Sequence, residues 1–127
     1  MIAELCITTL LTVTAYVPGA GGINGGLKGG YDRIDGKWVG GKVLTDSDAA
    51  CGFGYHFGTT FTVLEGSEIL ARNGMPRGRV CNDRGGAIRN QNLDLVVTGP
   101  NAIERARNWG KRTILVQICP KDYPGSH

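Results

Sequence analysis

The pattern of hydrophobic and polar positions indicates short β-strands along most of the chain. Residues 5–17 are rich in Thr, Val, Ile and Leu and end at Pro18, and the segment 59–64 alternates between polar and apolar side chains. The same kind of composition predicts further strands at 38–44, 78–81, 93–97 and 113–119.

One segment has helical spacing instead. Pro100 suits the first position of a helix, apolar residues follow at helical intervals through Trp109, and Gly110 ends the segment. Residues 65–67 are expected to form a turn. Residues 19–41 contain ten glycines without periodicity, which predicts a long loop of the functional kind. The sequence therefore predicts a single mainly β domain over residues 1–127, a six-stranded barrel with one short helix.

Composition narrows the class of protein. The chain is 41% hydrophobic and 20% charged, as in a soluble globular protein, and glycine accounts for 21 of its 127 residues. A net charge of +3, spread along the chain, is too small for a nucleic-acid-binding surface. No apolar run is long enough to span a membrane. The opening segment 1–13 lacks a basic region and is interrupted by Glu4, so we interpret it as an ordered strand and not as a signal peptide.

The four cysteines, at positions 6, 51, 81 and 119, indicate an exported protein with two disulfides. They contain no Cys-x-x-Cys pair and only two histidines accompany them, which argues against a zinc site. Three pairings are possible. If the first and last strands are neighbours, Cys6 pairs with Cys119 and Cys51 with Cys81. The alternative is four buried thiols in a cytosolic protein.

Asp94 is the carboxylate whose context is most unusual. It interrupts Asn-Leu-Asp-Leu-Val-Val at 92–97, a segment otherwise suited to a buried strand. Burial disfavours the charged form of a carboxyl and raises its pKa, which is the property that a general acid needs near neutral pH. The alternative is an aspartate that faces solvent or accepts backbone hydrogen bonds.

Other polar and aromatic residues have weaker signals. Asp83 lies in a turn-forming run, where a structural role is the simpler interpretation, and Asp46 and Asp48 lie in a similar one. His56 has no serine or cysteine partner that would make it catalytic. Aromatic residues on or near the glycine-rich loop are candidates for stacking on sugar rings, with ordinary packing as the alternative: Tyr16, Tyr31 and Trp38.

Five segments in a fixed order resemble the three-aspartate domain, a double-psi β-barrel found in peptidoglycan-cleaving transglycosylases. They are Thr-Ala-Tyr at 14–16, Val-Leu-Thr-Asp at 43–46, Phe-Gly-Thr-Thr-Phe-Thr-Val at 57–63, Asn-Asp-Arg-Gly-Gly-Ala-Ile at 82–88 and Asn-Leu-Asp-Leu at 92–95. The fourth and fifth segments are also similar to rare lipoprotein A. The resemblance implies a double-psi barrel whose three aspartates are Asp46, Asp83 and Asp94, with Asp48 as an alternative to Asp46.

The resemblance implies a peptidoglycan lytic transglycosylase in which Asp94 is the acid and base, assisted by Asp83, while Asp46 or Asp48 contacts the glycan. We expect Tyr16 and Trp38 to contact the glycan as well. We also expect a monomer without a metal or organic cofactor, located outside the cell or in its envelope. Barwin-like endo-β-1,4-glucanases and expansins share this barrel. An inverting glucanase needs a second carboxylate, and Val17 and Pro18 occupy the place where that residue is expected. An expansin-like module would bind the wall without cleaving it.

Overall fold

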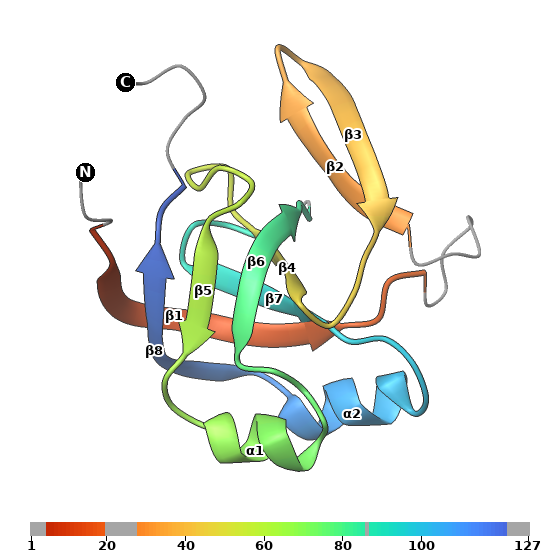
Figure 1. The fold of residues 1–127 in the computed structure, drawn as a ribbon, viewed down its shortest axis with the longest axis vertical. Helices are drawn as coiled ribbons and strands as arrows, with labels where there is room; N and C mark the ends of the chain where they lie inside the picture. Colours follow the sequence, from red (N-terminus) through yellow and green to blue (C-terminus); the bar gives the residue numbers. More distant parts are fainter. Residues whose placement is uncertain (1–4, 20–27, 86, 122–127) are drawn as a thin grey trace.

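Six strands close into a barrel in the computed structural model, which describes residues 5–19, 28–85 and 87–121. The strands follow one another around the wall in the order β1-β7-β4-β6-β5-β8, with both parallel and antiparallel neighbours. The expected mainly β, six-stranded barrel is therefore confirmed (Figure 1). The barrel strands are β1 (Ile7–Tyr16), β4 (Asp48–Cys51), β5 (Thr60–Val63), β6 (Gly78–Asp83), β7 (Asn92–Val96) and β8 (Arg112–Cys119).

Apolar side chains of every strand fill the barrel, because alternate residues of a strand point to opposite faces. In β1, for example, Leu11 and Val13 point inward and Thr12 and Thr14 point outward. Burial of each large apolar side chain contributes roughly 1.5 to 3 kcal/mol. The buried core includes Leu11, Val13, Phe61, Val63, Leu93, Leu95, Val116 and Ile118.

Two short helices, α1 (Ser67–Arg72) and α2 (Ala102–Trp109), lie together at one end of the barrel (Figure 1). The helix expected from Pro100 is α2, and its buried Trp109 donates a hydrogen bond of 3.2 Å from the indole nitrogen to the carbonyl of Val13. The segment 65–67, expected as a turn, leads directly into α1, whose N-cap is Gly66 at φ 77°. No helix in the described ranges is long and apolar enough to cross a membrane.

A two-stranded hairpin, β2 (Lys28–Ile34) and β3 (Lys37–Val43), stands away from the barrel at the other end from the helices (Figure 1). Asp35 and Gly36 connect the strands with φ of 52° and 76°, the positive pair that a tight hairpin turn needs. Most of the described part of the expected loop at 19–41 therefore forms strands, and residues 20–27 of it lie outside the described residues. The strand expected at 38–44 belongs to this exposed hairpin and not to the barrel. The sixth barrel strand is β4 instead.

Two disulfides close the barrel wall, and both preferred pairings are present. Cys6 beside β1 is bonded to Cys119 at the end of β8, and Cys51 of β4 is bonded to Cys81 of β6. In each case the two strands are neighbours in the wall. The expectation of an ordered strand over residues 1–13 is met from Ile7 onward, and residues 1–4 lie outside the described part of the chain.

Candidate active site

Asp94 lies on the outer face of the barrel wall, in the middle of β7. Its neighbours Leu93 and Leu95 belong to the core, so the alternation of the strand directs the Asp94 side chain outward. The side chain is nevertheless half-buried. Thr14 lies beside Asp94 in the register of β1 and β7, and its hydroxyl donates a hydrogen bond of 2.9 Å to Asp94 Oδ1.

This environment makes Asp94 a weak acid. Burial raises the pKa of Asp94 from 3.8 to about 6, the hydrogen bond from Thr14 opposes that rise, and the negative charge of Asp83 adds to it. A carboxyl with such a pKa holds its proton in a substantial fraction of molecules near neutral pH, and is also readily reprotonated. Both properties suit a group that donates and then accepts a proton.

Asp83, at the end of β6, belongs to the same row of residues across the wall. A β-bulge shifts the pairing of β4 with β6, so that Ala49 lies opposite Cys81 but Ala50 lies opposite Asp83. On its other side, Ala50 lies opposite Asp94 in the pair of β4 with β7. One small side chain, that of Ala50, therefore separates the two carboxylates across three adjacent strands.

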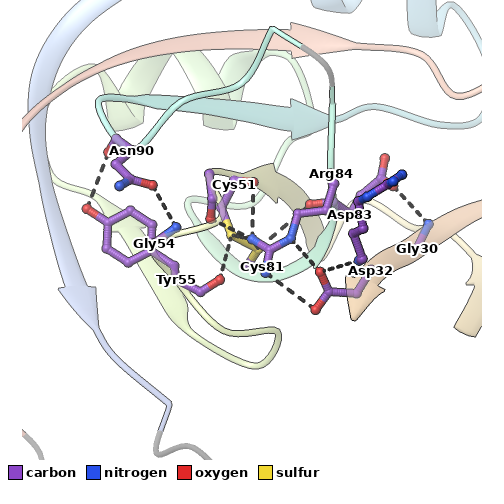
Figure 2. Close-up of polar contacts among 11 residues, drawn as sticks. Gly30, Asp32, Cys51, Gly54, Tyr55, Cys81, Asp83, Arg84 and Asn90 are labelled. Atoms are coloured by element: carbon purple, nitrogen blue, oxygen red, sulfur yellow. Dashed lines mark hydrogen bonds and ion pairs between the residues drawn. A yellow bond between two sulfur atoms is a disulfide. The ribbon is translucent and has the colours of Figure 1, made fainter. Parts of the chain in front are cut away.

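Tyr16 and a backbone amide hold the Asp83 carboxylate. The Tyr16 hydroxyl donates a short hydrogen bond to Oδ2. The Gly30 amide of the hairpin donates one of 2.9 Å to Oδ1, which Figure 2 shows. Burial raises the pKa of Tyr16, and the hydrogen bond to Asp83 and the charges of Asp83, Asp94 and Asp48 raise it further. The phenol thus remains a hydrogen-bond donor, with its hydroxyl bound to Asp83.

Asp48 is buried and fully engaged in hydrogen bonds. It accepts bonds from Lys42 Nζ at 2.9 and 3.0 Å, from the Thr45 amide at 2.8 Å and from Asn82 Nδ2 at 2.7 Å. Burial raises the pKa of Asp48, but the hydrogen bonds from Asn82, Lys42 and Thr45 outweigh burial and hold that pKa below 3.8. Asp48 therefore serves as a fixed negative charge near Tyr16.

Asp46 binds a different part of the molecule. Its Oδ1 accepts hydrogen bonds from the amide and hydroxyl of Thr98, at 2.6 and 2.8 Å, and its Oδ2 accepts one of 3.2 Å from Arg105 of α2. The structure therefore groups Asp48, and not Asp46, with the carboxylates around Tyr16. The spacing of the two residues in the sequence gives no means of separating them.

Trp38 and Tyr31 of the hairpin form one side of a small cavity next to Asp83. The cavity has a volume of about 390 Å³ and is lined by Tyr31, Trp38, Asp83 and Arg84. The indole of Trp38 is about half exposed, at 54%. The hairpin therefore places exposed aromatic surface beside the Asp83 carboxylate, an arrangement suited to ring-shaped ligands.

Arg84 is a residue of this region that the sequence analysis did not single out, although it follows Asp83 directly. Its guanidinium is buried and forms an ion pair with Asp32 of the hairpin at 2.9 Å. Nη1 also donates to the carbonyls of Cys51 and Gly52 and lies 3.1 Å from the Cys51 sulfur. Figure 2 shows Arg84 joining the Cys51–Cys81 disulfide to the hairpin.

His56, whose role the sequence left open, is exposed and lines a second, larger cleft that Arg84 also lines. Within the described residues, no group of three or more histidine, cysteine, aspartate or glutamate side chains is arranged to hold a metal ion.

Comparisons with known proteins give one structural similarity to report. No protein-family model matches the chain, and no curated protein matches it. A solved structure of a variant of the lytic transglycosylase MltA from E. coli, in an apo form, is similar with a TM-score of 0.44 and 25% sequence identity. The similarity covers 63% of this chain and 25% of that one, so this chain spans about a quarter of that protein's length.

Proposed function

We infer that the protein is a peptidoglycan lytic transglycosylase in which Asp94 is the general acid and base. The observation that carries this inference is the state of Asp94, an outward-facing carboxyl whose burial raises its pKa to about 6. It lies one small residue away from Asp83, which Tyr16 and Gly30 hold in place. The resemblance to the three-aspartate domain supports the same residue independently.

The reaction needs only one carboxyl for proton transfer. Protonated Asp94 donates its proton to the glycosidic oxygen as the bond from that oxygen to the anomeric carbon breaks. A hydroxyl of the same sugar then attacks the anomeric carbon and gives its proton to the Asp94 carboxylate. The products are a shortened strand and a 1,6-anhydro sugar end, and Asp94 is again protonated. The negative charge of Asp83 favours the protonated starting form of Asp94.

An inverting glucanase is the alternative, and it needs a second carboxylate free to activate water. The three other aspartates that the resemblance brings into question, Asp46, Asp48 and Asp83, already form hydrogen bonds or ion pairs within the protein. Both oxygens of Asp83 accept hydrogen bonds, Asp48 binds Lys42 and Asn82, and Asp46 binds Thr98 and Arg105. Their engagement favours a mechanism with one proton-transferring carboxyl.

The two disulfides favour a protein that works in an oxidising location outside the cytoplasm. Such a location is also where peptidoglycan is found, so the redox chemistry and the proposed substrate agree.

Product analysis tests the proposal directly. The protein is incubated with purified peptidoglycan and, separately, with soluble cellulose, and the released fragments are measured by mass spectrometry. We expect 1,6-anhydromuramoyl ends from peptidoglycan, without a matching rise in reducing sugar. Reducing ends at an equal rate would mean hydrolysis, cellulose fragments would indicate a glucanase, and binding without any product would indicate an expansin-like module.

A further inference from the structure

A second cleft lies between the hairpin and the loop that follows β4, and the proposed mechanism does not use it. Its volume is about 730 Å³, within the range of sites that hold small molecules. Residues of β2, β3 and the loop line it, among them Arg33, Ile34, Asp35, Val39, Phe53 and Phe57. Apolar surface and a few polar groups therefore face the same space.

The base of this cleft is built rigidly. The Arg84 guanidinium lies 4.9 Å from the ring centre of Phe53 and 4.7 Å from that of Phe57, so it contacts both aromatic rings. The same guanidinium is bound to Asp32 and to the carbonyl of Gly52, as Figure 2 shows for the polar contacts. A ligand that binds against this wall loses little free energy to side-chain ordering, because these side chains are already held in place.

The cleft adjoins the cavity beside Asp83. Arg84 lines both spaces, and Gly30 lines the cleft while its amide binds the Asp83 carboxylate. The Trp38 ring of the small cavity lies 6.4 Å from the Phe53 ring of the cleft, measured between ring centres. A polymer that is bound beside Asp83 therefore has its next unit within reach of the cleft.

The charges in the cleft favour an uncharged ligand. Two aspartates, Asp32 and Asp35, are balanced by two arginines, Arg33 and Arg84. Arg84 is paired with Asp32, and Arg33 lies over the Trp38 ring at 5.3 Å. A strongly acidic ligand would meet as much negative as positive charge here, so charge gives it no advantage.

The exposed surfaces match a sugar that carries an acetamido group. Phe53 offers a ring that is 53% exposed for the apolar face of a sugar, and Ile34 and Val39 offer aliphatic surface for a methyl group. Arg33 and Asp35 supply a donor and an acceptor for hydroxyl and amide groups. We propose that this cleft is a second glycan subsite that binds an N-acetylhexosamine unit adjacent to the scissile bond. The proposal rests on the proposed function for its choice of polymer.

Binding measurements with a matched pair of oligosaccharides test it. The ligands are the β-1,4-linked pentamers of N-acetylglucosamine and of glucose, which differ in the acetamido groups. All proteins carry Asp94→Asn so that no ligand is consumed, and affinity is measured by titration calorimetry. Ile34→Ala removes cleft surface, and Ile103→Ala on α2 is the control, because the two side chains are equally exposed at 52% and 53%. Phe53→Ala provides a second cleft variant.

We expect the N-acetylated pentamer to bind about tenfold more weakly to Ile34→Ala and Phe53→Ala, and with unchanged affinity to Ile103→Ala. The glucose pentamer should bind more weakly than the N-acetylated pentamer to every protein, and Ile34→Ala should change its affinity little. Equal binding of the N-acetylated pentamer by all variants, or no binding by the parent protein, would overturn the proposal.

Two further results separate this proposal from the proposed function. The first is binding of the free stem peptide of peptidoglycan. If Ile34→Ala weakens the binding of that peptide but not the binding of the N-acetylated pentamer, the cleft binds peptide and the sugar assignment is wrong. If the protein with Asp94 intact releases no product from peptidoglycan but the pentamer binding depends on Ile34, the subsite stands and the catalytic proposal fails.

Discussion

Asp94 is the residue on which the proposed mechanism depends, and its replacement is the sharpest test at the scale of a residue. Asp94→Asn keeps the shape and can still accept the hydrogen bond from Thr14, but the amide has no proton to deliver. We expect the cleavage rate to fall by at least about a hundred- to ten-thousand-fold, the range of general acid catalysis. Rates are measured on purified peptidoglycan, with circular dichroism to verify the fold.

Asp83→Asn is the comparison for that experiment. It removes the charge that Tyr16 and Gly30 hold, so we expect a smaller loss of rate than in Asp94→Asn. A folded Asp94→Asn protein that keeps more than about a tenth of the activity would move the acid to another aspartate.

The pH dependence of the rate follows from the same carboxyl. Because burial raises the pKa of Asp94 to about 6, the protonated form that begins the reaction is lost as the pH rises through that value. We therefore expect the rate with peptidoglycan to decline tenfold per pH unit above about pH 6.5. A rate that stays constant from pH 5 to pH 8 would contradict this assignment of the acid.

Asp94 also costs the fold some stability, and the sign of this effect can be tested. A carboxyl whose pKa is about 6 in the folded chain and 3.8 in the unfolded one binds more protons when folded. The contribution of Asp94 to stability is therefore most favourable below about pH 4 and is lost as the pH rises through about 6. At pH 7 Asp94→Asn should raise the free energy of unfolding by about 1 to 3 kcal/mol, and at pH 4 by much less. Urea denaturation at both pH values measures the difference.

At the scale of elements, the hairpin of β2 and β3 owes its position to a few polar contacts with the barrel. Gly30 donates to Asp83, Lys42 pairs with Asp48, and Asp32 pairs with Arg84. Each contact ends on a residue within or next to the proposed site. The hairpin and the carboxylates are thus held by the same interactions, and disturbing one should disturb the other.

Asp32→Asn tests this coupling, because it removes the negative charge that pairs with the buried guanidinium of Arg84. We expect faster hydrogen exchange of the amides in β2 and β3, and a loss of stability of about 1 to 3 kcal/mol. Asp35→Asn, at the exposed tip of the same hairpin, is the control and should leave both quantities unchanged. Unaltered exchange in Asp32→Asn would mean that the ion pair contributes nothing to the position of the hairpin.

The elements also show where reading the sequence succeeds. The apolar composition of 93–97 is enough to predict β7, and it makes Asp94 the unusual residue within that strand. β4 was missed because Asp-Ala-Ala-Cys at 48–51 is short and lacks β-branched residues, so its strand conformation depends on its neighbours β6 and β7. The hairpin was missed although Asp35-Gly36 is a strong turn signal, because the surrounding glycines suggested a loop.

The function of Arg84 could not be predicted from the sequence for a different reason. Its partners lie at positions 32, 51 and 52, and only the folded barrel brings these positions together. The choice between Asp46 and Asp48 depends in the same way on long-range contacts, with Arg105 for the first and Asn82 for the second. Local pattern identifies unusual residues, whereas the assignment of partners requires the fold.

For the whole molecule, the two disulfides are contributions to stability that substitution or reduction can remove. The Cys6–Cys119 bond closes a sequence separation of 113 residues, and the Cys51–Cys81 bond closes one of 30. Loop-closure entropy gives about 4 to 5 kcal/mol for the longer loop and about 3 to 4 for the shorter. Replacing Cys6 and Cys119 by serine should therefore lower the free energy of unfolding more than replacing Cys51 and Cys81, as measured by urea denaturation.

The cleavage rate should depend more on the Cys51–Cys81 bond than on the Cys6–Cys119 bond. The Cys51–Cys81 bond lies against Arg84, so its loss should also lower the cleavage rate, while loss of Cys6–Cys119 should act on stability alone. Mass spectrometry of the native protein should show a mass lower by about four hydrogens than that of the reduced form. Four thiols that react with an alkylating reagent in the native protein would contradict the oxidised state.

The row formed by Thr14, Asp94, Ala50 and Asp83 has a consequence for biosynthesis. Its members come from β1, β7, β4 and β6, and β1 reaches its place only by pairing with β7 and β8, the last strands of the barrel. A ribosome that has made residues 1–95 has therefore made every residue of this row, but β8, one of the two neighbours of β1, is still missing. On the proposed function, we expect partial chains that end before β8 to be inactive, because β1 then has only β7 to hold it in the wall.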